Sequence, residues 1–430
     1  MYICGRKPIQ NYSMEKELIK RLIVEKQTEI SRLDLIIRPL EIEANANYVF
    51  VGMRRAGKSY LMYQLIQERV QSGLFEMKQV LYVNFEDERI AQINASDLGL
   101  LLDAYLEMYD ARPVIFLDEI QNIAGWEKFA RRLADSHYRV YITGSNAQML
   151  SKEIYTTLGG RFIAYEVYPF SFSEYLKFEG ITLTPNWEYG DLKFQVKRLF
   201  NQYFYSGGFA ESFSMVDKRS WLNALYQKIL LGDIITRNDI RNENAIRVLV
   251  KKLSESVMQP GSLSKLKHVI DTTGANISRN TLVEYLQYLT DSYLIFGISN
   301  FSDKLTEKET FKKRYFFDNG LLNIFLFDPE TKLLENIVAI HLIKKYGDDL
   351  YYYNRNIEVD FFIPKAGLAI QVAYDLSSEK TREREIRALQ KLSEIYTLNK
   401  LLIITYDSEM QLIENDLEVQ VVPVWKWLLM

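Results

Sequence analysis

Eight residues, Gly52 to Ser59, carry the clearest chemistry in the sequence, because GMRRAGKS fits the phosphate-binding pattern G-x-x-x-x-G-K-[ST]. The two glycines permit backbone angles and close approaches that a Cβ would obstruct. Backbone N–H groups would then face phosphate oxygens, with Lys58 reaching the β- and γ-phosphates and the Ser59 hydroxyl binding Mg²⁺. We predict that the nucleotide contacts include Gly52, Arg54, Arg55, Ala56, Gly57, Lys58, Ser59 and Tyr60. Arg54 and Arg55 either add positive potential or are solvated, and the sequence does not separate these two interpretations.

A second motif lies about 60 residues further on, where Val114-Ile115-Phe116-Leu117 is followed by Asp118 and Glu119. Strands often end in charged residues, but the distance from a matched phosphate loop favours a catalytic interpretation. Parallel α/β sheets place ligands at the carboxyl ends of their strands. We therefore predict that Asp118 holds Mg²⁺ through water and that Glu119 polarises the attacking water.

Two further candidates follow in the same stretch of the chain. Val140 to Asn146 reads as a strand that ends in small polar residues, and Asn146 is expected to contact the γ-phosphate or to orient water. The alternative for this segment is a polar turn. Arg161, after Gly159-Gly160, would stabilise charge on the transferring phosphoryl group, from its own chain or from a neighbouring subunit. The alternative is an ordinary surface or capping arginine.

Strand and helix patterns alternate between residue 47 and about residue 170, which predicts a parallel α/β sheet. Met14 to Ile37, before it, has the apolar spacing of one or two amphipathic helices. The strand candidates are Tyr48–Val51, Val80–Phe85, Val114–Leu117, Val140–Thr143 and Phe162–Val167.

Composition limits the classes that the protein can belong to. With 430 residues, two to four domains are expected at about 150 residues per domain. The net charge of −3 excludes a global basic field, so any nucleic-acid site must be a local patch. Cys4 is the only cysteine, which excludes an intrachain disulfide. No apolar run reaches the roughly 18 residues of a membrane helix, and the first residues lack the apolar core of a secretory signal, so we expect a cytoplasmic protein.

Four segments together resemble one family, the prokaryotic AAA-type ATPases that carry a second conserved domain of unresolved function. They are GMRRAGKS, FLDEIQNIAGWEKFARRLAD, YITGSNAQML and LGGRFIAYEVYPFSFSEYL. The resemblance implies ATP as the nucleotide and an AAA-like core whose parallel strands lie in the order 5-1-4-3-2. By position it implies the first motif for Lys58 and Ser59, the second for Asp118 and Glu119, the polar sensor for Asn146 and the following arginine for Arg161. The segment Tyr168 to Tyr175 matches the family's exit from the sheet, a linker that seats the next domain.

The middle of the chain has the pattern of a winged helix-turn-helix. A helix over Leu263–Thr272 is followed by a turn at Gly274, a second helix that begins at Arg279, and a hairpin from Ile295 to Phe317 as the wing. In such a fold the second helix can enter a DNA major groove. We expect contacts with double-stranded DNA from Arg279, Asn280, Lys312 and Lys313. Nearby acids dilute the charge, and a protein-interaction or lid module is the alternative.

The last hundred residues resemble the PD-(D/E)xK nuclease fold. Glu335 on a helix and Asp360 at a strand fit the first two acidic positions. Gln371 stands where the second strand acid belongs, and Ala373 stands where the lysine belongs. Glutamine lacks the anionic charge that a hard cation favours, and alanine offers no cation. We therefore predict that this domain is catalytically inactive.

The predicted organisation is N-terminal helices over 1–37, the AAA-like core over 38–180, a helical lid or linker over 181–245, a winged-helix domain over 246–325 and a nuclease-like α/β domain over 326–430. The expected function is that of a Mg²⁺-dependent ATPase whose nucleotide state moves the winged-helix region. A regulatory switch or scaffold with incidental turnover is the alternative, and a DNA nuclease is less favoured. A protein partner and a homo-oligomer are also considered, whereas a membrane is not.

Overall fold

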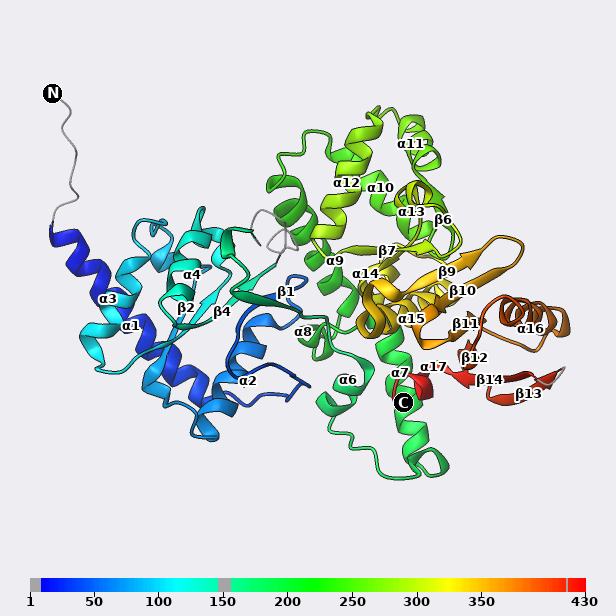
Figure 1. The fold of residues 1–430 in the computed structure, drawn as a ribbon, viewed down its shortest axis with the longest axis horizontal. Coiled ribbons are helices and arrows are strands. Elements are labelled where there is room, and N and C mark those ends of the chain that lie inside the picture. Colours follow the sequence, from blue (N-terminus) through cyan, green and yellow to red (C-terminus); the bar gives the residue numbers. More distant parts are fainter. Residues whose placement is uncertain (1–8, 146–155, 415–416) are drawn as a thin grey trace. The chain divides into compact units, whose positions relative to one another are not determined.

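The computed structural model describes residues 9–145, 156–414 and 417–430. The chain divides into two compact units, which we call unit 1, Met1–Tyr168, and unit 2, Pro169–Met430 (Figure 1). The segments 181–245, 246–325 and 326–430 all lie within unit 2. Their finer division into separate domains stays a prediction.

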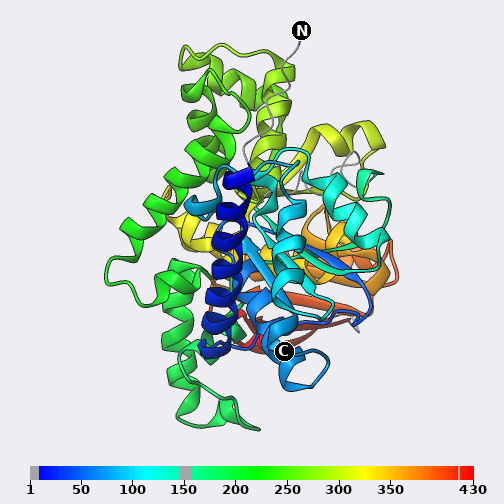
Figure 2. The ribbon, with the colours of Figure 1, turned by 90° about the vertical axis from the view of Figure 1, so that its left-hand side faces the viewer.

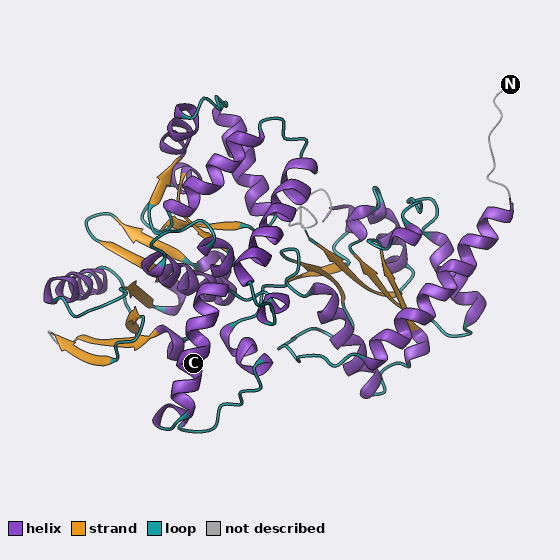
Figure 3. Cartoon of the chain, turned by 180° about the vertical axis from the view of Figure 1, so that it is seen from behind, coloured by secondary structure: helices purple, strands orange, loops and turns teal. Residues whose placement is uncertain are grey.

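Unit 1 is built on a five-stranded sheet in the order β2-β3-β4-β1-β5, and every neighbouring pair is parallel. This is the predicted order 5-1-4-3-2 seen from the other edge, so the AAA-like α/β fold is confirmed. Helices lie on both sides of these strands (Figure 3). The strands are β1 Asn47–Val51, β2 Val80–Asn84, β3 Val114–Asp118, β4 Arg139–Gly144 and β5 Phe162–Glu166.

The helices of unit 1 cover the sheet. Helix α1 packs against α2, α3 and β2 (Figure 2), and its buried Ile19, Leu22, Ile23 and Ile30 recur at helical spacing. Gln27, on the same helix, is buried and donates to the carbonyl oxygen of Val80 at 2.8 Å. The helices are α1 Ile9–Arg32, α2 Lys58–Gln71, α3 Gly99–Met108 and α4 Trp126–Asp135, with short 3-10 turns η1 Met77–Gln79, η2 Glu88–Ile90 and η3 Ile120–Asn122.

Unit 2 begins with a mostly helical part, as the sequence predicts. A π-helix, η6 Ile229–Thr236, holds the buried Asp233, whose carboxylate lies 3.5 Å from the Arg237 guanidinium. The elements before the sheet are α6 Phe172–Phe178, η5 Trp187–Tyr189, α7 Leu192–Ser206, α8 Ala210–Phe213, α9 Lys218–Lys228, η6 and α10 Glu243–Glu255.

The rest of unit 2 is organised around a nine-stranded mixed sheet in the order β13-β14-β12-β11-β10-β9-β7-β8-β6. Its strands are β6 Pro260–Ser262, β7 Ile295–Asn300, β8 Phe311–Phe316, β9 Tyr351–Asn354, β10 Glu358–Ile363, β11 Leu368–Val372, β12 Lys400–Thr405, β13 Met410–Glu414 and β14 Leu417–Pro423. Its helices are α11 Leu263–Thr272, α12 Arg279–Asp291, α13 Leu305–Thr310, α14 Asn319–Asn323, α15 Glu330–Tyr346, α16 Glu379–Ser393 and α17 Val424–Trp427, with 3-10 turns η7 Gly347–Asp349 and η8 Pro364–Ala366.

The helix-turn-helix pattern takes the form of α11 and α12 followed by the antiparallel pair β7–β8, which is the arrangement expected of a wing. The wing is not detached, however. Strand β7 also pairs in parallel with β9, through Ser299 with Tyr351 and Asn300 with Tyr352. Pairing satisfies a strand edge that would otherwise stay open. The strands predicted for the wing and the strands predicted for the nuclease-like domain therefore form one sheet.

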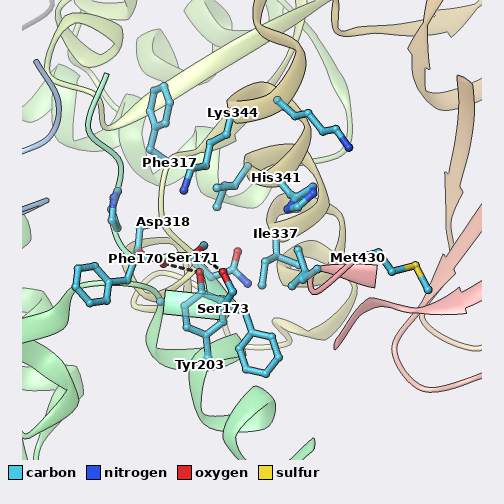
Figure 4. A pocket seen from close by; sticks show the side chains of 17 residues that line it. Phe170, Ser171, Ser173, Tyr203, Phe317, Asp318, Ile337, His341, Lys344 and Met430 are labelled. Atoms are coloured by element: carbon cyan, nitrogen blue, oxygen red, sulfur yellow. Dashed lines mark hydrogen bonds between the residues drawn. The ribbon is translucent and has the colours of Figure 1, made fainter. Parts of the chain in front are cut away.

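The segment after Tyr168 is held inside unit 2 by backbone contacts. The N–H of Phe170 donates to the carbonyl oxygen of Gly208 at 2.7 Å. Tyr203 donates its hydroxyl to the carbonyl oxygen of Phe170 at 2.7 Å (Figure 4). A Cβ at position 208 would lie 2.2 Å from that Phe170 oxygen, so the approach requires glycine. This geometry agrees with a structural role for the segment. It borders a cavity of about 320 Å³ that His341 also lines.

In the part of the chain that the structure describes, no helix combines the length and the apolar character needed to cross a membrane.

Candidate nucleotide site

The phosphate loop, residues 52–59, joins the end of β1 to the start of α2, as the sequence predicts. Gly52 lies so close to the end of β5 that a Cβ there would meet the carbonyl oxygen of Val167 at 2.1 Å. Gly57 has a φ of 95° and is the N-cap of α2. It has no side chain that could accept hydrogen bonds from the first-turn amides. The N-terminus of α2 is thus built in the manner of an anion site.

Lys58 lies over this loop with only 4% of its surface exposed. Its ammonium donates to the carbonyl oxygens of Gly52 and Met53, both at 3.1 Å. The same nitrogen is 3.5 Å from Glu119 Oε1. One buried cation therefore links the first motif with the second.

Asp118 and Ser59 meet directly, because the Ser59 hydroxyl donates to Asp118 Oδ1 at 3.1 Å. The carboxylate also accepts hydrogen bonds from Tyr82, to Oδ2 at 2.5 Å, and from the Thr143 hydroxyl. Burial raises the pKa of Asp118, and these hydroxyls counter part of the rise. Burial also raises the pKa of Tyr82 well above its ordinary value, so this phenol stays a donor.

Glu119 follows with a left-handed φ of 52°, and its backbone N–H donates to the Thr143 hydroxyl at 2.8 Å. Its carboxylate accepts a hydrogen bond from the amide of Gln121. Burial works to raise the pKa of Glu119, but the Lys58 ammonium and the Gln121 amide outweigh it, and the pKa is lowered. Glu119 is therefore an anion at neutral pH. Gln121 Oε1 is buried and has no hydrogen-bond partner among the described residues.

Two residues of this site were missed by the sequence reasoning. Arg38 supports the loop, since its guanidinium donates to the carbonyl oxygens of Ala56 at 3.0 Å and Tyr168 at 2.9 Å. Tyr82 orients Asp118 from the neighbouring strand. A polar tip in the apolar run VLYVN was the available signal for Tyr82. Arg38 stands in an irregular segment without a local pattern.

The remaining loop residues differ in their surroundings. Arg54 pairs with Glu86 at 3.0 Å, and Arg55 is exposed in a left-handed conformation with a φ of 63°. Ala56 is buried. Tyr60 is 59% exposed on the first turn of α2, with its ring 5.5 Å from that of Tyr63. None of these positions conflicts with a nucleotide contact.

Asn146 lies outside the described residues, whereas Ser145 before it is described and buried. Arg161 is not brought to the loop of its own chain. It precedes β5 at the amino edge of the sheet, where its guanidinium binds Asp135 at 2.8 Å. The loop leaves the carboxyl end of β1, which is about 16 Å away along five strand residues. The geometry therefore does not support a role within the chain, and a role in a neighbouring subunit stays a prediction.

The residues present fit a magnesium nucleotide. A hydroxyl and a carboxylate oxygen lie 3.1 Å apart beside a buried ammonium, and both are the hard oxygen donors that Mg²⁺ prefers. A cation placed between them would favour the ionised form of Asp118, opposing the effect of burial. Ser59 and Asp118 would hold the metal ion, and Lys58 with the loop amides would hold the phosphates.

In unit 2, Arg279 and Asn280 are exposed at the N-terminus of α12, and Ser278 caps that helix. Lys312 is half-buried and lies 3.5 Å from Glu309. The DNA contact predicted for Lys313 is wrong, because this side chain is only 1% exposed. Successive side chains of a strand point to opposite faces of the sheet, so the Lys313 side chain is buried whereas that of Lys312 is not.

The nuclease-like positions also come together in unit 2. Glu335 is buried, and Asp360 follows on β10. The Gln371 side chain is hydrogen-bonded to the backbone through both ends of its amide. Its Oε1 accepts from the N–H of Asp360 at 2.9 Å, and its NH₂ group donates to the carbonyl oxygen of Glu358 at 3.0 Å. Within the described ranges, no group of three or more acidic, histidine or cysteine residues is arranged to hold a metal ion.

Comparisons with known proteins also separate an ATPase core from the segments that follow it. Residues 44–176 match a family model described as an AAA domain. Residues 197–332 and 330–427 match two further models, both described as domains of unknown function.

Among curated proteins, the chain is 34% identical over 432 residues to "Uncharacterized protein MJ1544" of Methanocaldococcus jannaschii, covering 96% of this chain and 95% of that protein. It is 29% identical over 349 residues to an uncharacterized protein of Haemophilus influenzae, covering 78% and 84% of the two chains.

Two solved structures show a remote likeness. The Aeropyrum pernix ORC1 protein, solved in complex with DNA, has 14% identity and a TM-score of 0.29, covering 75% of this chain and 93% of that one. AMPPCP-bound DnaA from Aquifex aeolicus has 16% identity and a TM-score of 0.26, covering 63% and 87%. At these scores, neither structure bears on what this chain binds.

Proposed function

We propose that this chain, which belongs to the family of AAA-type P-loop ATPases that carry domains of unknown function after the ATPase core, is a cytosolic enzyme that binds ATP and hydrolyses it with Mg²⁺. The observation that carries the proposal is the pair of contacts between the two motifs. Ser59 meets Asp118 at 3.1 Å, and Lys58 meets Glu119 at 3.5 Å.

Each of these residues has a separate task. Lys58 and the loop amides would hold the triphosphate, and the buried Asp118 would be kept in place by Tyr82 and Thr143. The bound Mg²⁺ would neutralise charge on the phosphate oxygens during transfer. Glu119 would orient the attacking water, because its lowered pKa keeps it an anion that accepts a hydrogen bond.

Glu119→Gln tests this assignment. The variant keeps the size and hydrogen-bonding capacity of the side chain but loses its charge, so ATP affinity should stay within about threefold while turnover falls by about 100-fold or more. Glu86→Gln is the matched control, because Glu86 is exposed and its carboxylate pairs with Arg54 at 3.0 Å. Unchanged turnover in Glu119→Gln would remove Glu119 from the reaction.

We also propose that the chain binds double-stranded DNA. This proposal rests on Arg279 and Asn280, which are exposed at the start of α12 in a helix-turn-helix pattern. Nucleotide state would then govern how this region meets double-stranded DNA. The test is the ATPase rate with and without duplex DNA, in the native chain and in Arg279→Ala. Stimulation that is lost in Arg279→Ala supports a DNA-acting enzyme, whereas a slow rate that DNA does not change favours a nucleotide-controlled switch or scaffold.

A further inference from the structure

Lys313 is a buried cation in the middle of three carboxylates. Its ammonium lies 3.1 Å from Asp360 Oδ1, 3.1 Å from Glu358 Oε1 and 3.7 Å from Glu335 Oε1. The lysine comes from β8 of the wing, whereas the carboxylates come from α15 and β10. The ring of Tyr352 lies 5.5 Å from the same nitrogen. A single side chain thus joins the winged-helix part to the nuclease-like part.

Two of the three acidic side chains also accept hydrogen bonds from other groups. Asp360 Oδ2 accepts from the N–H of Val372 at 3.0 Å, and Glu335 Oε1 accepts from the Tyr315 hydroxyl at 2.7 Å. Burial alone would lower the pKa of Lys313, but Asp360, Glu335 and Glu358 raise it above its ordinary value, so the side chain stays charged. Burial and the neighbouring Asp360 raise the pKa of Glu335 to about 8, so the ammonium pairs mainly with the charged Asp360 and Glu358, both at 3.1 Å.

We propose that the ammonium of Lys313 occupies the place that a divalent metal ion takes among such carboxylates, so that unit 2 carries its own cation on the chain. All three carboxylates contact the one nitrogen, and Gln371, the fourth candidate, is bound to the backbone through both ends of its amide. A cleft of about 1010 Å³ opens over this site, lined by Glu335, Glu358 and Asp360. A molecule bound in this cleft would not be cleaved in a metal-dependent reaction.

The test compares Lys313→Met with Lys312→Met in the full chain. Lys312 is the neighbour on the same strand, and its ammonium pairs with Glu309 at 3.5 Å. Loss of the inner ammonium leaves Asp360 and the buried Glu335 without their counter-charge, so Lys313→Met should lower Tm by roughly 10 °C. Added Mn²⁺ should restore part of that loss. The number of Mn²⁺ ions bound without nucleotide, measured by electron paramagnetic resonance, should be one higher in Lys313→Met than in the native chain or in Lys312→Met.

The additional ion should disappear in Lys313→Met combined with Asp360→Asn. A Lys313→Met chain that folds but gains no Mn²⁺ would overturn the proposal. If Lys313→Met does not fold, the comparison of the native chain with Asp360→Asn decides. Equal numbers of Mn²⁺ ions in these two proteins support the internal cation, and a lower number in Asp360→Asn refutes it, since a metal would then share the site with Lys313.

Discussion

The Ser59 hydroxyl donates to Asp118 Oδ1 at 3.1 Å, although the two residues are 59 positions apart in the chain. This contact exists because β1 and β3 both end at the carboxyl edge of one parallel sheet, where the loop after β1 turns into α2. Lys58 and Glu119, each the direct neighbour of one partner, meet at the same edge. The site in unit 1 gives three specific expectations, and a buried histidine of unit 2 gives a fourth.

The first concerns magnesium. The native chain should bind ATP more tightly with Mg²⁺ than with a chelator. In Asp118→Asn this ratio of affinities should be at least tenfold smaller, a difference of about 1.4 kcal/mol. The physical reason is that an amide oxygen lacks the charge that a hard dication favours. Fluorescent-ATP titrations in both conditions measure the effect. Asp87→Asn, at the N-cap of η2, is the control and should behave as the native chain. An equal response to the chelator in both variants would mean that Asp118 does not serve the metal.

The second concerns loop geometry. Gly52→Ala should weaken ATP binding at least tenfold, because the new Cβ would lie 2.1 Å from the Val167 carbonyl oxygen and must displace the loop. Gly99→Ala is a matched control on α3, where the nearest atom would be 3.8 Å away. Calorimetric titration with ATP compares the two. Native affinity in Gly52→Ala would show that the loop does not set the phosphate position.

The third concerns Arg161, which binds Asp135 at the amino edge of the sheet. Arg161→Ala should leave the ATP affinity of dilute chain within about twofold of native, since the guanidinium does not face the loop of its own chain. If a neighbouring subunit uses it, the turnover rate will rise with protein concentration in the native chain and will not rise in Arg161→Ala. Loss of ATP affinity in dilute Arg161→Ala would contradict the position found here.

The fourth is a pH dependence carried by His341. Burial, together with Lys344 and Lys345, lowers the pKa of His341 to about 4 from an ordinary value of 6.5. The unfolded chain therefore binds the proton first, and stability that is present above pH 6.5 is lost as the pH falls towards 4. The loss should be about 2 kcal/mol between pH 7 and pH 5.

Thermal or urea unfolding of the native chain and of His341→Gln at the two pH values measures this loss. Asp318, whose pKa burial raises to about 6, titrates with the opposite sign in both proteins, so subtraction isolates the histidine. Equal pH slopes for the two proteins would show that His341 is already charged in the fold.

The sequence was most informative where local pattern and position agree. The motif GMRRAGKS predicts a strand before it and a helix after it. The apolar run before Asp118 predicts a buried strand that ends at this acid. The strand order came from the family resemblance, and the sheet has that order. The limits lie in contacts between distant elements, which no local pattern encodes.

Lys313 illustrates this limit. In sequence it is one of several cations in a wing, and its burial depends on strand phase and on carboxylates that come from β10 and α15. The pairing of β7 with β9, which merges two expected domains into one sheet, has the same origin. Arg161 was placed by its family position, but strand register puts it at the opposite edge from the loop. Arg38 supports the loop from a segment without regular structure, so periodicity could not reveal it.

Calorimetric titration of the native chain and of Lys58→Ala with Mg·ATP, with folding checked by circular dichroism, tests whether this loop binds the nucleotide. The ammonium lies at the centre of the two motifs, within 3.5 Å of Glu119 and 3.1 Å of two loop carbonyl oxygens. We expect saturable binding by the native chain and a loss of at least tenfold in affinity, about 1.4 kcal/mol, in Lys58→Ala. No heat of binding in the folded native chain would show that the loop does not bind ATP, and equal affinity in both proteins would show that Lys58 does not hold the phosphates.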